Sequence, residues 1–190
     1  MDNLCRCPWV NLDKPDYIRY HDEEWGVPVH DDRTQFEFLT LESAQAGLSW
    51  YTVLHKRENY RQAFAYFDPE LVARYDEKMI AQLLQNSGLI RNKLKINAAI
   101  NNAQKFLQIQ EEFGSFSDYI WRFVDGEPID NAPQTGKDIP ATSKESDLLS
   151  KDLKQRGFKF VGSTIIYAHM QATGLVNDHT SGCFRRKELL

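Results

Sequence analysis

The sequence predicts an all-α protein, and three observations lead to that expectation. Apolar residues recur at helical spacing through most of the chain. No run of alternating apolar and polar residues is long enough to indicate a sheet. Residues that start or end helices lie between the apolar segments. A chain of 190 residues can form one substantial core, or two small lobes that share one.

The first predicted helices lie in the first third of the chain. Residues 34–46 are apolar nearly all round the helical wheel, so we expect a buried helix that ends at Gly47. Ser49 can cap a second helix over about 50–64. The Asp-Pro pair at 68–69 is typical of a helix start, because the first helical position needs no N–H group.

The middle of the chain predicts a helical hairpin. A helix opens at Asp76, and the sequence Asn-Ser-Gly at 86–88 interrupts it. A long amphipathic helix then follows over 92–112, and Gly114 closes it. Two helices joined by a short glycine-containing turn are therefore expected here.

The last third of the chain predicts further helices and one long loop. Residues 115–118 and 142–145 each have the pattern of a capping box. Between them, residues 125–141 contain three prolines and two glycines, so we expect an irregular loop of a kind that is often functional or mobile. A final helix is expected over 164–173, with Gly174 as its stop.

Composition narrows the class of protein. The chain is 42% hydrophobic and 26% charged, which is ordinary for a soluble globular protein, and no apolar run reaches membrane-spanning length. The net charge of −4 gives no overall basic field, so a nucleic-acid contact would need a local patch. Three cysteines and the lack of a signal-peptide pattern make a disulfide framework improbable and favour a reducing intracellular compartment.

The two ends of the chain carry candidate metal ligands. Cys7 and His21 lie near the start, and His179 and Cys183 lie four residues apart near the end. Two thiolates and two imidazoles complete a tetrahedral set for Zn²⁺, which leaves no open position for chemistry and would tie the termini together. Cys5 is an alternative to Cys7, and each residue is also compatible with an ordinary packed or exposed position.

Glu42 is the strongest candidate for a functional carboxylate. On a helical wheel it falls between Phe38 and Ala46 on the apolar side, whereas Glu37 lies well away. A carboxylate buried there is costly unless it is paired or hydrogen-bonded. Three explanations are open: a salt bridge to a nearby arginine, a helix that turns Glu42 outward, or a pocket for a ligand that is cationic or rich in donors.

Aromatic residues gather near Glu42 and near the candidate metal ligands. Trp9 follows Cys7, and Tyr20 and Trp25 flank His21. Trp50 lies shortly after Glu42, beyond a flexible glycine and the exposed-looking Leu48. Most aromatic residues belong to a core, but flat rings beside one buried carboxylate also suit a pocket for a planar base.

The hairpin is a candidate for phosphate binding. Backbone N–H groups at the start of its second helix can hold a phosphate, and Gly88, Arg91, Lys93 and Lys95 lie in or just after the turn. Many helical hairpins bind nothing, so this pattern is weak when taken alone. A second basic cluster comprises Lys151, Lys154, Arg156 and Lys159.

Taken together, six strings resemble the 3-methyladenine DNA glycosylase I family over nearly the whole chain. They are residues 7–10, 20–28, 41–50, 56–60, 156–162 and 174–179. The resemblance implies an all-helical member of the helix-hairpin-helix DNA glycosylase superfamily, with a Cys-His-His-Cys zinc site that joins the termini. The hairpin has one glycine where the superfamily usually has two, and the superfamily's catalytic aspartate has no counterpart here, as is thought true of this family.

The same resemblance implies a role for each candidate residue. Cys7, His21, His179 and Cys183 match the ligands of one structural Zn²⁺ per chain, and Glu42 matches the carboxylate that recognises the base. Aromatic residues match the base-binding pocket, with Tyr20 and Trp50 as the rings that sandwich the base and Trp9, Tyr17 and Trp25 as further lining. Leu48 matches an apolar wedge that enters the DNA, and Gly88, Arg91 and Lys93 are expected to contact DNA.

We therefore expect an enzyme that hydrolyses the N-glycosidic bond of 3-methyladenine in double-stranded DNA and has no lyase step. Free 3-methyladenine and an abasic site would be its products. The expected organisation is a single unit over 1–190, with a hairpin lobe over 34–150 and a zinc-clipped lobe formed by 1–33 and 151–190. We expect a monomer without membrane contact, in the bacterial cytoplasm and associated with the nucleoid.

Two other functions fit parts of the sequence. A non-catalytic DNA- or RNA-binding module would use the same hairpin and zinc clip, and would bind without releasing a base. A zinc hydrolase would use His21, His179 and one cysteine, leaving the fourth metal position open. The presence of four candidate ligands and the absence of an H-E-x-x-H motif argue against the hydrolase.

Overall fold

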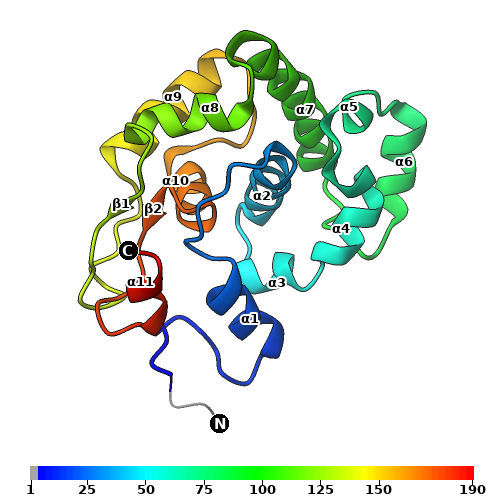
Figure 1. Ribbon diagram of the computed structural model, residues 1–190. Coiled ribbons are helices and arrows are strands. Elements are labelled where there is room, and N and C mark those ends of the chain that lie inside the picture. The colour runs from blue at the N-terminus through cyan, green and yellow to red at the C-terminus, as the bar shows by residue number, and fades with distance from the viewer. Residues whose placement is uncertain (1–3) are drawn as a thin grey trace.

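Helices dominate the computed structural model, which describes residues 4–190 (Figure 1). The all-α prediction is confirmed. In chain order the elements are α1 (Pro15–Glu23), α2 (Asp32–Gln45), α3 (Trp50–Leu54), α4 (Arg57–Ala63), η1 (Ala65–Phe67), α5 (Pro69–Val72), α6 (Glu77–Gln85), α7 (Lys93–Phe113), α8 (Phe116–Trp121), η2 (Arg122–Val124), β1 (Ile129–Asp130), α9 (Lys144–Gln155), α10 (Ser163–Ala172), β2 (Val176–Asn177) and α11 (Phe184–Glu188).

Local capping chemistry explains most helix starts. A side-chain oxygen at the N-cap accepts a hydrogen bond from an N–H group of the first turn, which has no partner inside the helix. The predicted caps that do so are Ser49, Asp68, Asp76, Asn92 and Ser115. The starts of α3, α5, α6, α7 and α8 therefore follow from short sequence signals.

The structure corrects the expected helix over 50–64. A turn at His55 and Lys56 divides it into α3 and α4. The Lys56 ammonium donates a hydrogen bond to the Ser87 carbonyl in the turn between α6 and α7, at 3.0 Å. The break between α3 and α4 thus coincides with a contact between segments that are distant in sequence. Local helix propensity cannot predict such a contact.

Three further differences concern single elements. The cap of α9 is Ser143, paired with Ser146, instead of the predicted Thr142 with Glu145. Helices α1 and α11 were not predicted. The long loop contains β1, which pairs in parallel with β2 through Ile129 and Val176, so a two-residue ladder supplements the helices.

Helices α2 and α10 lie side by side at the centre of the fold, with α7 running beside α2 toward α5 and α8 (Figure 1). A large core spans α2 to α10. A second, smaller core joins the N-terminal segment to α1, α2 and α10, and includes Tyr20, Trp25 and Phe38. Trp50 packs against both cores.

A glycine lets the segment after α10 approach the segment after α1 closely. Gly174, at the end of α10, has φ +74°, and a Cβ there would lie 2.4 Å from the backbone N of Pro28 and the carbonyl carbon of Val27. The chain that follows α10 therefore runs directly against the segment that follows α1. Figure 1 shows α11 near α1 and the N-terminal segment.

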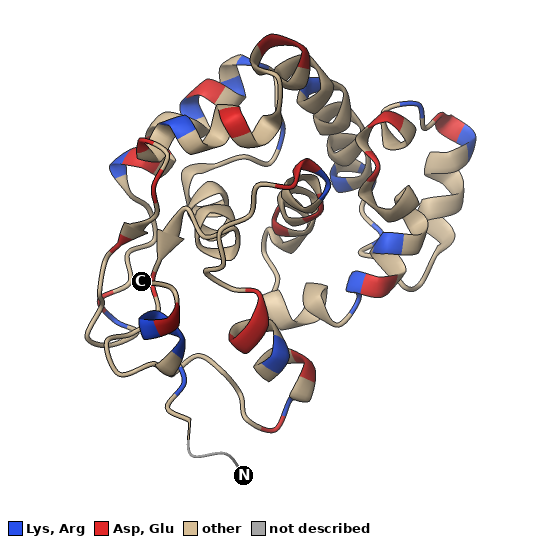
Figure 2. Ribbon diagram, viewed as in Figure 1, with Lys and Arg blue, Asp and Glu red and all other residues tan. Residues whose placement is uncertain are grey.

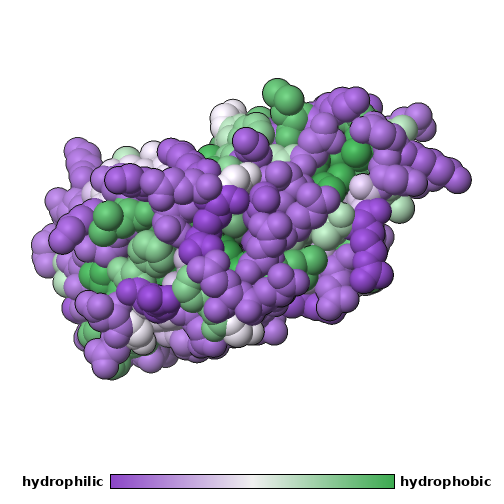
Figure 3. Space-filling model, turned by 90° about the horizontal axis from the view of Figure 1, so that it is seen from above, coloured by the Kyte–Doolittle hydropathy of each residue, from purple (hydrophilic) through white to green (hydrophobic). Residues whose placement is uncertain are grey.

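The surface carries mixed charge. Lys and Arg alternate with Asp and Glu on peripheral helices such as α9 (Figure 2). Polar side chains cover most of the face in Figure 3, with separate apolar areas between them. Within residues 4–190, no helix combines the length and apolar character needed to cross a membrane.

Candidate functional site

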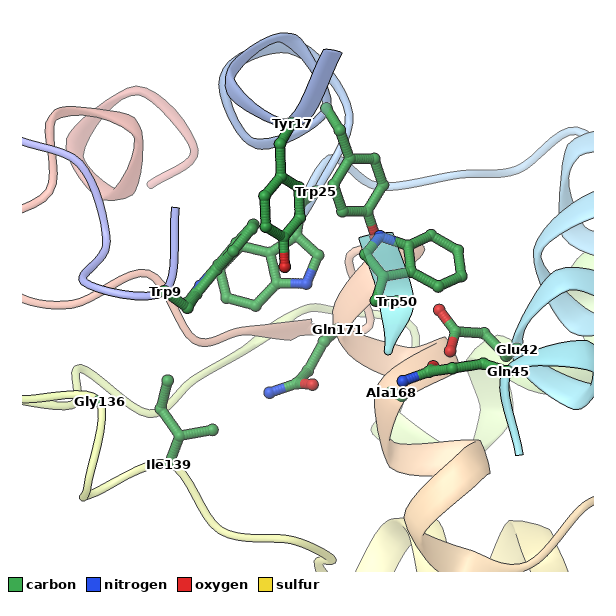
Figure 4. Close-up of a pocket in the computed structure, with 11 residues that line it drawn as sticks. Trp9, Tyr17, Trp25, Glu42, Gln45, Trp50, Gly136, Ile139, Ala168 and Gln171 are labelled. Carbon is green, nitrogen blue, oxygen red and sulfur yellow. The ribbon is translucent and has the colours of Figure 1, made fainter. Parts of the chain in front are cut away.

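A cavity of about 290 Å³ lies where α1, α2, α3 and α10 approach the N-terminal segment and the long loop (Figure 4). This volume is near the lower end of the range for small-molecule pockets. The residues that line it are Trp9, Tyr17, Tyr20, Trp25, Glu42, Gln45, Trp50, Gly136, Ile139, Ala168 and Gln171. The structure thus places at one cavity the six predicted residues Glu42, Tyr20, Trp50, Trp9, Tyr17 and Trp25.

The aromatic walls of the cavity are packed against one another. The ring centroids of Tyr20 and Trp50 are 5.3 Å apart, and those of Trp9 and Tyr17 are 5.1 Å apart. Trp9 also meets Trp25 edge to face at 5.0 Å. Contacts of this kind hold large rings in fixed positions, so the cavity has rigid, flat sides.

Glu42 lies in the cavity with little access to solvent. Its side chain, on α2, leaves the residue 3% exposed, and its carboxylate points into the space below Trp50 (Figure 4). Among residues 4–190, no group forms a hydrogen bond or ion pair with the Glu42 carboxylate. Burial raises the pKa of Glu42 to about 8. An outward-turned Glu42 is therefore excluded.

An arginine does not neutralise Glu42. Arg57, whose charge acts on Tyr20 as that of Glu42 does, donates instead to Glu37 at 2.6 Å and to Glu24. Arg61 also donates to Glu37, at 2.9 Å. Because these guanidinium groups are committed elsewhere, the negative charge of an ionised Glu42 would be available to a ligand.

Tyr20 faces the same electrostatic environment. It is 3% exposed, and burial followed by the nearby charge of Glu42 raises its pKa well above the ordinary value. Its phenol therefore stays protonated at neutral pH, and the ring presents a neutral face to the cavity.

Five lining residues were missed by the sequence reasoning. Gln45 lies one turn beyond Glu42 on α2, so helical spacing alone was a sufficient signal for it. Ala168 and Gln171 share a face of α10 by the same spacing, but nothing in the sequence joins α10 to α2. Gly136 and Ile139 come from the long loop, which forms the opposite edge of the cavity (Figure 4).

The four predicted metal ligands meet in a buried cluster. One ligand atom from each of Cys7, His21, His179 and Cys183 lies within 4.8 Å of the others. Sulfur-to-nitrogen separations are 3.4 Å for Cys7–His179, Cys183–His21 and Cys183–His179. Tetrahedral zinc with ordinary Zn–S and Zn–N bonds separates such atoms by about 3.5 Å, so the donor set and spacing fit a metal ion.

The remaining ring nitrogens of both histidines have partners of their own. His21 Nδ1 lies 2.7 Å from Asp22, whose carboxylate is held by Arg6. His179 Nε2 lies 2.9 Å from the Trp25 carbonyl oxygen. These contacts orient each ring so that His21 offers Nε2 and His179 offers Nδ1 to the cluster, as outer partners of metal ligands commonly do.

The cluster also supports the aromatic cavity. Trp25 meets the His179 ring edge to face at 4.6 Å, and Trp9 meets His21 at 5.2 Å. Cys5 is exposed and lies outside the cluster, which settles the choice between the two cysteines in favour of Cys7. Four buried ligands leave no open position, so the arrangement disfavours a zinc hydrolase.

The predicted DNA-contacting residues lie outside the cavity. Leu48 is 40% exposed in the turn between α2 and α3. Arg91 and Lys93 are exposed beside the α6–α7 turn, and Gly88 is half-buried in it. The N–H groups of Gly88 and Ile90 already donate to Asn86 and Tyr60, so the hairpin offers fewer free backbone donors than the motif suggests.

The helical fold and the aromatic cavity around an unpaired carboxylate define a class of helical proteins with a pocket for a flat ligand that is cationic or rich in donors. Solved structures agree. A crystal structure of 3-methyladenine DNA glycosylase I superposes with a TM-score of 0.92 at 53% identity, covering 95% of this chain and 98% of that one. The Staphylococcus aureus enzyme, described for 3-methyladenine recognition, superposes with a TM-score of 0.92 at 37% identity, covering 96% and 97%.

Sequence relatives give the particular family. DNA-3-methyladenine glycosylase 1 of Escherichia coli K12 is 52% identical over 94% of this chain and 95% of its own length. The Haemophilus influenzae enzyme is 48% identical over 94% and 96%. The methyladenine glycosylase family model matches residues 9–186, and the chain belongs to this family. The resemblance found in the sequence is confirmed.

Proposed function

We propose that this protein is a DNA repair glycosylase that hydrolyses the N-glycosidic bond of 3-methyladenine in alkylated DNA. The products are the free base and an abasic site, with no lyase step. The observation that carries the proposal is the buried, unpaired Glu42 among flat rings. Relatives whose names state this activity, and a related structure that contains 3-methyladenine, support it.

Cleavage of the N-glycosidic bond requires little assistance from the protein to the departing base. An adenine methylated at N3 is positively charged within the nucleoside, so it leaves readily and requires no strong general acid. The protein must extrude the nucleotide, hold the base selectively and let water reach C1′ of the sugar. This is consistent with a cavity in which Glu42 is the one carboxylate among the described lining residues.

The pocket residues divide this work between stacking and charge. Tyr20 and Trp50 stack on the base, and a cation–π contribution favours the methylated form over neutral adenine. Glu42 accepts hydrogen bonds from the donor edge of the base and complements its charge. Stacking of about 1–3 kcal/mol per base offsets much of the cost of unstacking. Undamaged adenine forgoes the charge contributions and is harder to extrude.

Other parts of the chain hold the pocket and the DNA. Zn²⁺ at Cys7, His21, His179 and Cys183 joins the termini and braces the aromatic wall, and it takes no part in the reaction.

Leu48 enters the duplex as a wedge, and Arg91, Lys93 and the Gly88 turn contact phosphates. The hairpin lobe comprises 34–150, and the zinc-clipped lobe comprises 1–33 and 151–190. The protein acts as a monomer on nucleoid DNA in the bacterial cytoplasm.

Incubation with methylated duplex DNA tests the proposal. Chromatography of the released material should show 3-methyladenine, and the strand should contain an abasic site that breaks only after alkali treatment. Binding of the same DNA without release of any base would instead support a non-catalytic nucleic-acid module.

We expect Trp50→Ala to weaken binding of free 3-methyladenine by about 5-fold to 150-fold, because a stacking surface worth about 1–3 kcal/mol is lost. Isothermal calorimetry measures the affinity without relying on tryptophan fluorescence. Tyr66→Ala removes an exposed ring that does not line the cavity and serves as the control. An unchanged affinity for the Trp50 variant would remove that ring from the binding site.

A further inference from the structure

Lys95 belongs to the basic run that follows the hairpin turn, but its ammonium is already engaged. It donates to the carbonyl oxygens of Ala44 and Ala46, at 2.9 and 2.7 Å. Both acceptors lie at the end of α2, where carbonyls lack partners within the helix and where a cation is favoured. By contrast, Arg91 and Lys93 are exposed, and Lys93 has only a loose contact with Glu77 at 4.0 Å.

The turn that Lys95 holds has few other anchors. Gly47 has φ +78°, and a Cβ there would meet nothing within 4 Å. Within the turn, the Leu48 N–H donates to the Gln45 carbonyl at 2.6 Å. Over the described part of the chain, the only hydrogen bonds that join residues 44–48 to another element are those from Lys95.

The hairpin is also attached to the segment beyond the Leu48 turn. Besides the Lys56 contact with Ser87, the Ile90 N–H donates to the Tyr60 hydroxyl at 3.2 Å. A Cβ on Gly88 would lie 2.7 Å from Cγ of Asn59, so the turn packs tightly on α4. The α6–α7 hairpin therefore holds the chain on both sides of Leu48 and Trp50.

We infer that Lys95 is a positioning residue that links the hairpin to the Leu48 turn and to the end of the helix that carries Glu42. This inference rests on the proposed function. When the hairpin binds the phosphates of a duplex, this link fixes where Leu48 and the mouth of the cavity lie relative to the DNA. The nucleotide that is extruded is then the one that faces the cavity. The phosphate contacts are left to Arg91 and Lys93.

Three variants test the link. Lys95→Met keeps the aliphatic stem and removes the donors, and Lys95→Arg restores donors and charge. Lys93→Met removes a positive charge two residues away without touching α2. Excision of 3-methyladenine is measured under single turnover on a paired duplex and on a duplex with the lesion opposite a mismatch, which is easier to extrude. Free-base affinity and thermal stability are measured in parallel.

We expect Lys95→Met to lower the maximal excision rate on the paired duplex on the order of tenfold, because small misplacements cost large factors in rate. The loss should be smaller on the mismatched duplex, free-base affinity should stay within about twofold, and Lys95→Arg should recover most of the rate. Lys93→Met should instead mainly raise KM. Lys95→Gln is a milder change, for use if the Met variant folds poorly. Its excision rate should also fall more on the paired duplex than on the mismatched duplex.

Three results would overturn the link. Wild-type rates for Lys95→Met and Lys95→Gln would show that the contact does not matter, and a rise in KM alone would make Lys95 a phosphate contact. Equal losses on both duplexes, together with lost free-base affinity, would indicate a general structural role and would also overturn it. Absence of base release by the wild-type protein would be a failure of the proposed function instead.

Discussion

Glu42→Gln is expected to slow 3-methyladenine release by about a hundredfold or more, the scale seen when a group aimed at reacting charge is removed. Glutamine keeps the size of the side chain and an acceptor oxygen, so the change isolates the negative charge. Single-turnover excision from methylated DNA measures the effect. Glu111→Gln, on the exposed face of α7, is the matched control and should retain the wild-type rate. Undiminished release by the Glu42 variant would contradict its proposed role.

The pH dependence of excision is a second test of the role of the Glu42 charge. The substrate cation does not titrate, whereas Glu42 ionises with a pKa of about 8 in the empty cavity. For the wild-type protein, kcat/KM should therefore rise as pH increases toward 8 and then level off. The Glu42→Gln protein should lack this rise.

The same ionisation should appear in protein stability. The folded-state pKa of Glu42, about 8, lies above the ordinary value of 4.5, so the folded protein favours the protonated acid. The contribution of protonated Glu42 to the free energy of unfolding is fully present below pH 4.5 and is lost as pH rises through 8. Relative to wild type, Glu42→Gln should thus gain on the order of 2–4 kcal/mol between pH 5 and pH 9, measured by urea unfolding at both values.

Loss of the metal is expected to have the largest effect on stability. Structural zinc sites bind with about 10 kcal/mol or more, and that energy is available only to the folded protein. Cys7→Ser or Cys183→Ser should abolish stoichiometric zinc in metal analysis. Even a stability loss of about 3 kcal/mol would lower Tm by about 6–12 °C in a chain of this size.

Cys5→Ser is the natural control for that experiment, because Cys5 is exposed and lies outside the cluster. It should keep one zinc per chain and the wild-type Tm. At a temperature where the zinc-free protein is still folded, the excision rate should change little, since the Cys/His cluster lies behind the aromatic wall. Full zinc content in the Cys7 variant would contradict the ligand assignment.

Local chemistry explains which parts of the fold were predictable. Helices α5, α6 and α7 begin where a short polar side chain caps the first turn, and these signals lie within four residues of the helix start. The division of 50–64 into α3 and α4 was missed, and at the break Lys56 contacts the hairpin, which lies 31 residues away in the sequence. The β1–β2 pair was missed because its two strands lie 46 residues or more apart in the sequence, and each is only two residues long.

The sequence by itself determined the helical class, the family, a set of candidate metal ligands and the placement of Glu42 on an apolar helix face, because periodicity, capping and residue type are properties of short segments. Only the tertiary structure decided which charges are free. Arg57 is taken by Glu24 and Glu37, so Glu42 stays unpaired, and Lys95 is taken by the end of α2. A charge is neutralised by whichever group folding brings within a few ångströms, and sequence spacing does not report that distance.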